Sequence, residues 1–225
     1  MNILTYPSPC LQSNMYVLAE SGKAIIIDPH CENGYYQKIA KVADRVDYII
    51  LTHEHYDHIS GTSEMRAFFG CPVLTSSVCA QRICDPTANF SRYFTAFCEL
   101  QNGEKLREIP QVEQYSCTAD MVFEKKHIMS WQGHEIVLTE TPGHSPGSIC
   151  ILVDNRFLFC GDTLSSKNGI FTRFPGGSKK MFNEVALPYI RALPDDVTVY
   201  PGHYESFLLT NSYMDKWFPN VPTID

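Results

Sequence analysis

The sequence has 225 residues and a formal net charge of -7, and 44% of its residues are hydrophobic while 19% are charged. A chain of this size can bury a sizeable core, so we expect a single domain over residues 1–225. No apolar run approaches the roughly 20 residues of a membrane span, so we expect no membrane partner. The acidic balance argues against a nucleic-acid partner, because contact with phosphates needs clustered Lys and Arg.

Short apolar runs with turns between them predict alternating strands and helices in the first half of the chain. The predicted strands are 3–6, 15–19, 24–28, 48–52 and 73–75, and the predicted helices are 35–43 and 59–69, the second ending at Gly70. Residues 85–115 are the least regular stretch, and we expect an insertion or lid over the surface there.

The second half of the chain also alternates predicted strands with a predicted helix. Its predicted strands are 136–141, 148–153, 156–160 and 197–200, and a helix is predicted over 180–193. The alternation of strands and helices favours a layered α/β arrangement. No Gly/Ser linker or low-complexity tract interrupts it, so no domain boundary is predicted.

The run 49–58 ends an apolar strand with a dense group of metal-ligand side chains. Alternate residues of an extended chain point the same way, so His53 and His55 are able to share one metal ion. Asp57 and His58 follow in the turn and are aimed at a neighbouring position. Four such side chains within six residues would be costly in a core unless something coordinated them.

Three later segments share this design, with a potential ligand just after a predicted strand. They are Thr141-Pro-Gly-His144, Cys160-Gly-Asp162 and Tyr200-Pro-Gly-His203. In each, a glycine allows the backbone to turn sharply immediately before the ligand. Strand-end loops are where α/β proteins usually build their sites, so we expect His144, Asp162 and His203 to join the first group.

At these residues the sequence resembles the metallo-β-lactamase superfamily, in particular its glyoxalase II-like and small thioester-hydrolase members. The motifs Thr-His-x-His-x-Asp-His, Thr-Pro-Gly-His-Ser-Pro-Gly, Gly-Asp-Thr-Leu, Phe-Pro-Gly-Gly-Ser and Tyr-Pro-Gly-His occur in the family order between about residue 14 and residue 203. The resemblance implies a four-layer αββα sandwich with a binuclear centre: His53, His55 and His144 on metal 1, Asp57, His58 and His203 on metal 2, and Asp162 bridging.

The same resemblance has three further implications. Asp28 is similar to a residue that supports the site from behind the ligands. The bridging Asp162 argues against antibiotic hydrolysis, because true β-lactamases of this fold generally have Cys or Ser at that position. The expected cofactors are two divalent ions, zinc first, with iron or manganese as alternatives.

Two such ions about 3.5 to 4 Å apart can bridge a water and lower its pKa toward about 7, which provides hydroxide without a Ser or Cys nucleophile. Asp57 is placed to orient that bridging hydroxide as well as to bind metal. The expected function is therefore metal-dependent cleavage of a small thioester or ester.

Two departures from the family pattern bear on the substrate. Small glyoxalase II-like members often carry Gly-Arg-x-Asp before Phe-Pro-Gly-Gly, but here Phe171 stands at the arginine position and Arg173 at the aspartate position. The sequence also ends 22 residues after His203, so we expect no counterpart of the helical domain with which glyoxalase II holds glutathione. We therefore expect no strong glutathione specificity.

Other functions within the fold stay open. A mononuclear iron persulfide dioxygenase would use His53, His144 and Asp162 as a facial triad. The altered Gly-Arg-x-Asp stretch argues against it, because those enzymes normally keep that stretch. A phosphodiesterase or nuclease is disfavoured by the acidic charge. A metal-binding protein without activity comes last, because every family ligand is present.

The remaining histidines, cysteines and aromatic residues allow simpler interpretations. His30, His127 and His134 are expected to be surface or hydrogen-bonded histidines, and Glu54 and Tyr56, which alternate with the ligands, are assigned no role. Phe90, Tyr93, Phe94 and Phe97 form one face if 89–100 is helical, which indicates ordinary packing or, alternatively, a lid over the metals. Nine cysteines without a Cys-x-x-Cys pair, and no secretory signal, favour the cytoplasm.

Overall fold

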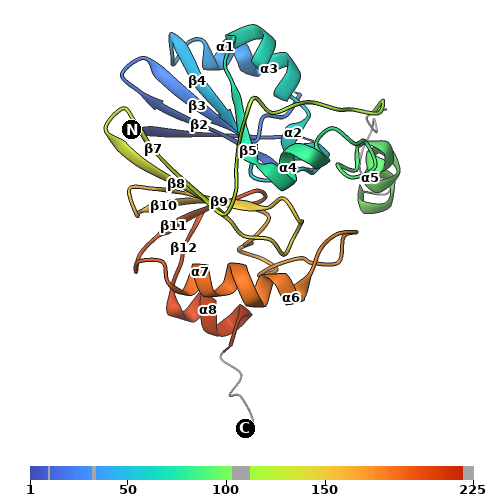
Figure 1. Cartoon of the computed structure of the whole chain (residues 1–225), viewed down its shortest axis with the longest axis vertical. Helices are drawn as coiled ribbons and strands as arrows, with labels where there is room; N and C mark the ends of the chain where they lie inside the picture. The colour runs from blue at the N-terminus through green and yellow to red at the C-terminus, as the bar shows by residue number, and fades with distance from the viewer. Residues whose placement is uncertain (10, 32–33, 103–111, 220–225) are drawn as a thin grey trace.

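A computed structural model describes residues 1–9, 11–31, 34–102 and 112–219. Two six-stranded sheets face each other, with α1 (Tyr35–Ile39) and α3 (Thr62–Phe69) over one and α6 (Lys179–Met181), α7 (Leu187–Arg191) and α8 (Asn211–Trp217) over the other (Figure 1). The predicted four-layer αββα sandwich is confirmed.

The first sheet contains its strands in chain order: β1 (Asn2–Pro7), β2 (Asn14–Glu20), β3 (Lys23–Ile27), β4 (Arg45–Ile50), β5 (Val73–Ser76) and β6 (Met121–Phe123). The first three strands pair antiparallel, and β3 to β6 pair in parallel. Because parallel strands all end at the same edge of a sheet, the loops after β3, β4 and β5 gather on one side of the molecule.

The second sheet contains β7 (Lys126–Trp131), β8 (His134–Glu140), β9 (Ile149–Val153), β10 (Phe157–Gly161), β11 (Thr198–Pro201) and β12 (Phe207–Leu208). Its strands pair antiparallel except for β10 and β11, which run in parallel. The parallel pair brings the ends of β10 and β11 together, and a hydrogen bond from Gly202 N to Gly161 O joins them there.

Strand residues alternate between two cores because both faces of each sheet are covered. In β3, Ile25 and Ile27 face the second sheet, whereas Ala24 and Ile26 pack beneath the helices over the first sheet. In β9 and β10 the outward residues pack against Phe182, in the π-helical segment η3 (Phe182–Ala186) between α6 and α7. Alternation with both faces buried gives the continuous apolar runs that identified these strands in the sequence.

Several predictions about the elements were incomplete. The predicted helix 35–43 ends at Ile39, and the predicted helix 59–69 is two helices, α2 (Tyr56–Ile59) and α3. The break lies at Gly61, which packs so closely on the backbone of His30 that a Cβ there would be 2.6 Å from the His30 carbonyl oxygen. Five further elements were not predicted from the sequence: α4 (Ser77–Arg82), α8, β6, β7 and β12.

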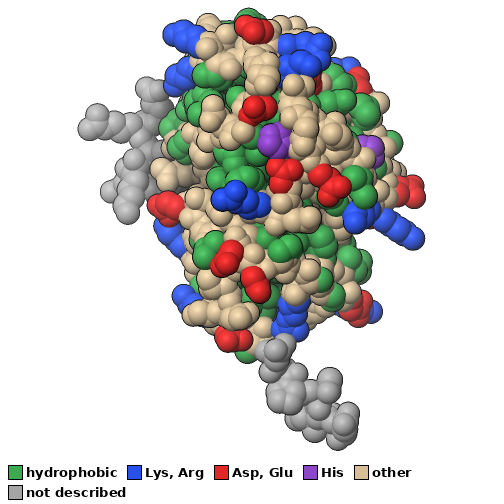
Figure 2. Space-filling view, turned by 90° about the vertical axis from the view of Figure 1, so that its left-hand side faces the viewer, with side chains coloured by type: hydrophobic (Ala, Val, Ile, Leu, Met, Phe, Trp, Pro, Cys, Tyr) green, Lys and Arg blue, Asp and Glu red, His purple; other side chains and the backbone are tan. Residues whose placement is uncertain are grey.

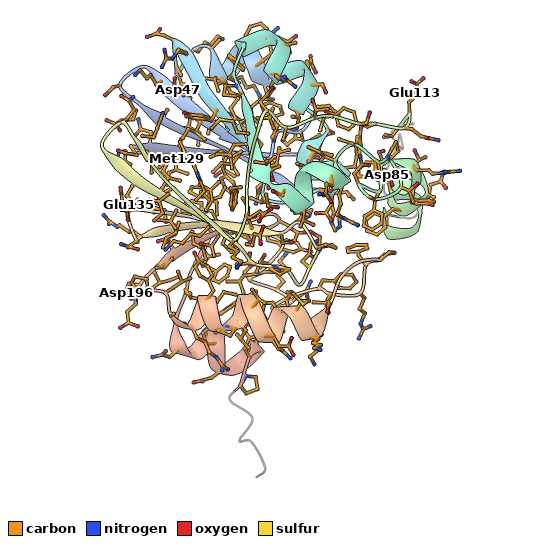
Figure 3. All side chains as sticks on the ribbon, viewed as in Figure 1. Asp47, Asp85, Glu113, Met129, Glu135 and Asp196 are labelled. Carbon is orange, nitrogen blue, oxygen red and sulfur yellow. The ribbon has the colours of Figure 1, made fainter. Side chains whose placement is uncertain are left out.

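The expected insertion at 85–115 contains the 3₁₀ turn η1 (Ser91–Tyr93) and α5 (Phe94–Asn102), and its residues 103–111 lie outside the described part of the chain. The labelled Asp85 and Glu113 lie on the side of the molecule that carries α5, and Asp47, Glu135 and Asp196 lie on the opposite side (Figure 3). On the face seen in Figure 2, acidic and basic side chains are interspersed. Within the described ranges, no helix is long and apolar enough to cross a membrane.

Candidate metal centre

The residues predicted to bind metal all lie in loops or turns that follow strands. The set comprises His53 and His55 after β4, Asp57 and His58 in α2, His144 after β8, Asp162 after β10, and His203 after β11. The structure brings all seven together from both sheets, on the side of the molecule where α2 and α5 lie (Figure 1).

Three imidazoles form a first group, the histidine trio of His53, His55 and His144. One ring nitrogen from each lies within 4.8 Å of the others, and all three residues are buried. His55 Nδ1 and His144 Nε2 are 3.0 Å apart. His53 Nε2 is buried and has no hydrogen-bond partner among the described residues. Converging ring nitrogens with an unsatisfied member are the geometry of a metal-binding site.

Asp57, His58 and His203 form a second group, the acidic trio, whose ligand atoms also lie within 4.8 Å of one another. His203 Nε2 is 3.3 Å from Asp57 Oδ2 and 3.4 Å from His58 Nε2. This trio differs from the first because it includes a carboxylate, which adds charge for a cation.

Asp162 lies between the two trios. Its Oδ2 is 3.4 Å from His144 Nε2 and 3.5 Å from His203 Nε2, and its Oδ1 is 3.6 Å from His58 Nε2. One carboxylate therefore contacts members of both groups, which is the placement that a bridging ligand requires.

Two hydrogen bonds and one ion-pair contact lie behind the ligands and orient three rings. Asp28, held at φ 53°, accepts from Thr52 N at 2.7 Å and from Thr52 Oγ1 at 2.5 Å, and its Oδ2 is 3.2 Å from His58 Nδ1. His144 Nδ1 lies 2.7 Å from the carbonyl oxygen of Phe171, and His203 Nδ1 lies 3.1 Å from that of Leu11. Each contact occupies the nitrogen that points away from the centre, as in metal sites whose histidines are held from behind.

Two glycines allow the strand-end loops to approach this closely. At Gly161, with φ 48°, a Cβ would collide with the Thr52 hydroxyl and lie 3.2 Å from His53 Nδ1. At Gly202 a Cβ would collide with the Asp162 carboxylate. The glycines in these two motifs are therefore required by contact as well as by the turn.

Glu54 has a structural role that the sequence analysis did not assign. It is fully buried, accepts from Arg82 Nε at 2.5 Å, and accepts from Ser145 Oγ at 2.8 Å. Because Glu54 lies between His53 and His55 in the chain, this network ties the loop of His144 to the end of β4. An acidic residue between two buried histidines was the available signal, since a buried carboxylate needs partners.

The two trios differ in electrostatics. Burial lowers the pKa of His53 and His55, and the nearby His58 and His144 respectively lower them further. Burial by itself would also lower the pKa of His58, but Asp57 and Asp162 outweigh it and raise that pKa to about 9. Without metal, the histidine trio therefore has neutral rings at His53 and His55, whereas His58 carries a proton at neutral pH.

The pKa values of the two carboxylates in the centre are lowered. Burial by itself would raise the pKa of Asp57, but His58 and His203 outweigh it and hold that pKa at about 2. The pKa of Asp162 lies well below its ordinary value for the same reason, with burial opposed chiefly by His203 and His58. Both carboxylates are therefore ionised over the whole neutral range, as cation ligands must be.

A cavity of about 510 Å³ opens onto the centre. Asp57, His144, Asp162 and His203 contribute to its floor, and much of the rest is aromatic. The predicted aromatic face of 89–100 divides in two: Phe94 is buried against Tyr56, with ring centroids 4.8 Å apart, whereas Phe97 faces Phe174. Packing therefore accounts for Phe94, whereas Phe97 lines the cavity and contacts Phe174.

The histidines outside the seven make ordinary contacts. His30 is buried with its Nε2 2.8 Å from the carbonyl oxygen of Tyr6, and His134 Nδ1 is 2.6 Å from Asp154 Oδ2. His127 lies on β7, partly exposed. None of the three joins the groups of potential metal ligands found among the described residues.

Comparison with known proteins yields relatives across most of the chain. A family model described as the metallo-beta-lactamase superfamily matches residues 8–203. A hydroxyacylglutathione hydrolase of Glaesserella parasuis serovar 5 is 29% identical over 198 residues, which are 88% of this chain and 68% of that protein.

Two solved structures share the fold over nearly the whole chain. The BLEG-1 B3 metallo-beta-lactamase superposes with a TM-score of 0.79 at 24% identity, covering 98% of this chain and 100% of that one. TTHA1623 in a di-iron-bound form gives a TM-score of 0.73 at 20% identity, with coverages of 98% and 100%. At such identities the likeness shows the architecture alone.

Proposed function

The chain belongs to the metallo-beta-lactamase superfamily, and on that premise we propose that it is a binuclear metal-dependent hydrolase that cleaves a small thioester or ester. The single observation that carries this proposal is the position of Asp162, within 3.6 Å of ring nitrogens from both trios. A carboxylate shared by two ligand groups is suited to two neighbouring cations rather than one.

The residues fit two divalent ions. The buried, unpartnered Nε2 of His53 is the kind of atom that a metal satisfies, and the ionised Asp57 and Asp162 supply compensating charge. We propose that metal 1 is held by His53, His55 and His144, metal 2 by Asp57, His58 and His203, and both by Asp162. We propose zinc, which binds histidine and carboxylate readily, with iron or manganese as alternatives; TTHA1623, of the same fold, has a di-iron-bound form.

When bound, the two ions supply an activated water at neutral pH and a Lewis acid for the substrate carbonyl. Residues of the chain orient the water and the metal ligands. Asp57, as an ionised acceptor at the cavity floor, orients the attacking water. Asp28 and the carbonyl oxygen of Phe171 hold His58 and His144 in fixed orientations, so little reorganisation accompanies the reaction.

We further propose that the enzyme has no strong preference for a glutathione leaving group. Phe171 and Arg173 replace the Arg and Asp of similar small hydrolases, and Phe171 rather than a basic residue lines the cavity. The metal ligands set the type of reaction, whereas the residues that line the cavity set the substrate selectivity. These lining residues differ from those of the similar small hydrolases. The glutathione specificity in the name of the Glaesserella relative is therefore not carried over.

We also propose that the protein works in the reducing cytoplasm. Five cysteines in the described part of the chain are buried free thiols: Cys71, Cys79, Cys117, Cys150 and Cys160. Such cysteines persist in a reducing compartment, where they act as small apolar side chains.

The test is metal quantitation on protein purified without added metal, combined with assays for thioester hydrolysis, β-lactam hydrolysis and oxygen uptake with a persulfide. We expect about two ions per chain and thioester turnover. One iron per chain with persulfide-dependent oxygen uptake would replace this proposal with the mononuclear dioxygenase, for which His53, His144 and Asp162 are the available triad. Turnover of the β-lactam in place of thioesters would also overturn it.

A further inference from the structure

We propose that the cavity beside the metal centre binds an uncharged, apolar acyl group and that Phe174 is the residue that selects it; this inference rests on the proposed thioester hydrolysis. Four residues carry it, and we call them the aromatic wall: Phe90, Phe97, Phe171 and Phe174. All four line the cavity of about 510 Å³ that contains the potential metal ligands.

Phe174 is the hub of the wall. Its ring centroid lies 5.8 Å from that of Phe90, 5.6 Å from that of Phe97 and 4.9 Å from that of Phe171. It also lies 5.5 Å from the ring of His55 and 5.8 Å from that of His144. An apolar group that touches Phe174 is therefore next to the histidine trio, where the carbonyl of the substrate must be placed.

Ordinary core packing does not explain the wall. Phe94, on the same helix as Phe97, is 8% exposed and belongs to a buried cluster, as a structural aromatic should. Phe90, Phe97 and Phe174 are only partly buried, and Phe171 is 45% exposed. Contiguous aromatic surface left uncovered inside a concave site is typical of a ligand-binding wall.

The backbone of Phe90 is strained in the position that it needs to reach the cavity. Its φ is 65°, a left-handed conformation that bulky residues avoid, and its ring lies 4.8 Å from that of His55. The buried Asn89 maintains this turn by donating to the carbonyl oxygens of Ile83 and Tyr115 and accepting from Ser91 N. Strain held in place beside a reactive centre points to function rather than to packing.

The charges of the cavity define the chemistry of the acyl group. Among the described lining residues there is no Lys or Arg, and the only carboxylates are Asp57 and Asp162, which face the metal centre. A negatively charged acyl group would therefore find no partner along the wall. Tyr204 also lines the cavity, with its ring centroid 6.2 Å from that of His203 in the acidic trio, and Lys167 Nζ lies 4.0 Å from the Tyr204 ring centroid. The apolar acyl group thus faces Phe174, and the thiol leaves toward Tyr204.

The first experiment compares kcat/KM for N-acetylcysteamine thioesters with acetyl, butanoyl, hexanoyl and succinyl groups. We expect a rise of at least about tenfold from acetyl to hexanoyl, because each buried methylene adds hydrophobic stabilisation. We expect succinyl to fall at least about tenfold below butanoyl, since its carboxylate must lose water without gaining an ion pair. Equal rates across the series would overturn the inference and leave the proposed hydrolase intact.

The second experiment locates the effect. Phe174→Ala should reduce the hexanoyl-to-acetyl ratio of kcat/KM at least about fivefold, and Phe97→Ala, which truncates the wall from α5, should also reduce it. The matched control is Phe68→Ala, because Phe68 is 53% exposed on α3 and contacts Tyr36 instead of the cavity. An unchanged ratio in both wall variants with normal metal content overturns the assignment.

A third readout does not depend on turnover. Calorimetry on the protein as purified should show S-hexyl-N-acetylcysteamine, a non-hydrolysable thioether, binding at least about tenfold more tightly than the S-ethyl compound. If the hexyl compound binds tightly but no thioester is cleaved, the apolar site stands and the proposed function fails. If thioesters are cleaved but the two compounds bind equally, the proposed function stands and the apolar site fails.

Discussion

The metal centre and the aromatic wall share one cavity but are built from different parts of the chain. The seven potential ligands follow strands of the two sheets, and buried side chains such as Asp28 and Glu54 brace the loops that carry them. The wall comes from Phe90 just before η1, from α5 and from the loop after β10, and its rings are partly exposed. The chemistry thus rests on strand ends of the two sheets, whereas selectivity rests on segments that can change without disturbing the sheets.

The largest expected effect is the loss of the shared carboxylate. Asp162→Ala should reduce metal content below one ion per chain and lower kcat/KM at least about a thousandfold, about 4 kcal/mol of transition-state stabilisation, because both trios lose a ligand. Elemental analysis and thioester kinetics measure the two effects, and Asp154→Ala, on the far surface, is the control. Two full sites in the Asp162 variant would show that this carboxylate does not bridge.

His203→Ala or His58→Ala removes one ligand from the acidic trio and leaves the histidine trio intact. Either change should lower the stoichiometry toward one ion and kcat/KM about a hundredfold, while the fold survives because the histidine trio remains. His134→Ala is the matched control, since that histidine pairs with Asp154 away from the cavity. Retention of two ions in both variants would refute the assignment of metal 2.

The two trios should also respond differently to pH. The pKa of His58 is raised to about 9 in the metal-free protein, so below that value a cation must displace a proton. At His203 too, burial is outweighed by Asp162 and Asp57, which raise the pKa, so its proton must also be displaced. The second equivalent of metal should therefore bind at least about tenfold more weakly for each unit that the pH falls between about 9 and 7. Burial lowers the pKa of His53 and His55, so the affinity for the first equivalent of metal should change little with pH. Competition with a chromogenic chelator measures both affinities, and equal slopes would contradict this difference.

The thiol end of the cavity is tested by changing the leaving group. Comparing kcat/KM for a glutathione thioester with that for the same acyl group on a simpler thiol should give a ratio within about tenfold, because the described residues that line the cavity include no Lys or Arg to bind the glutathione carboxylates. An advantage above about a hundredfold for glutathione, about 2.7 kcal/mol, would show a dedicated glutathione site.

The smallest expected effect concerns the thiols. Alkylating the exposed Cys31 and Cys84 should change turnover less than about twofold, because the proposed mechanism uses no thiolate. Burial raises the pKa of Cys150 to about 12, which keeps that thiol protonated and unreactive. Loss of turnover on alkylation with unchanged metal content would count against metal-dependent hydrolysis.

The apolar runs of strands buried on both faces predicted a layered α/β arrangement, and the αββα sandwich followed from the resemblance of the motifs to the metallo-β-lactamase superfamily. The meeting of the seven side chains was predicted because they come at or just after the ends of such strands. It missed β6 because Met121–Phe123 is too short to show a pattern, and it missed β7 because polar residues such as Lys126, His127 and Ser130 stand between its apolar ones. Short edge strands are defined by pairing, which a single sequence does not display.

The roles of two residues in the site, Glu54 and Phe174, were not predicted from the sequence pattern. Glu54 was assigned no role because its partners, Arg82 and Ser145, are distant in the chain. Phe174 stands out in the sequence only as part of the Phe-Pro-Gly-Gly-Ser motif, and its role depends on Phe90 and Phe97, which meet it through tertiary contact. Contacts between distant segments, rather than local propensity, decide both cases.

The most direct test of the binuclear centre is a metal titration of the chelator-treated protein with thioester turnover as the readout. If both trios act together through Asp162, turnover should stay low through the first equivalent of zinc and rise to its maximum as the second equivalent binds. Full turnover at one equivalent, with no further gain from the second, would contradict the central claim.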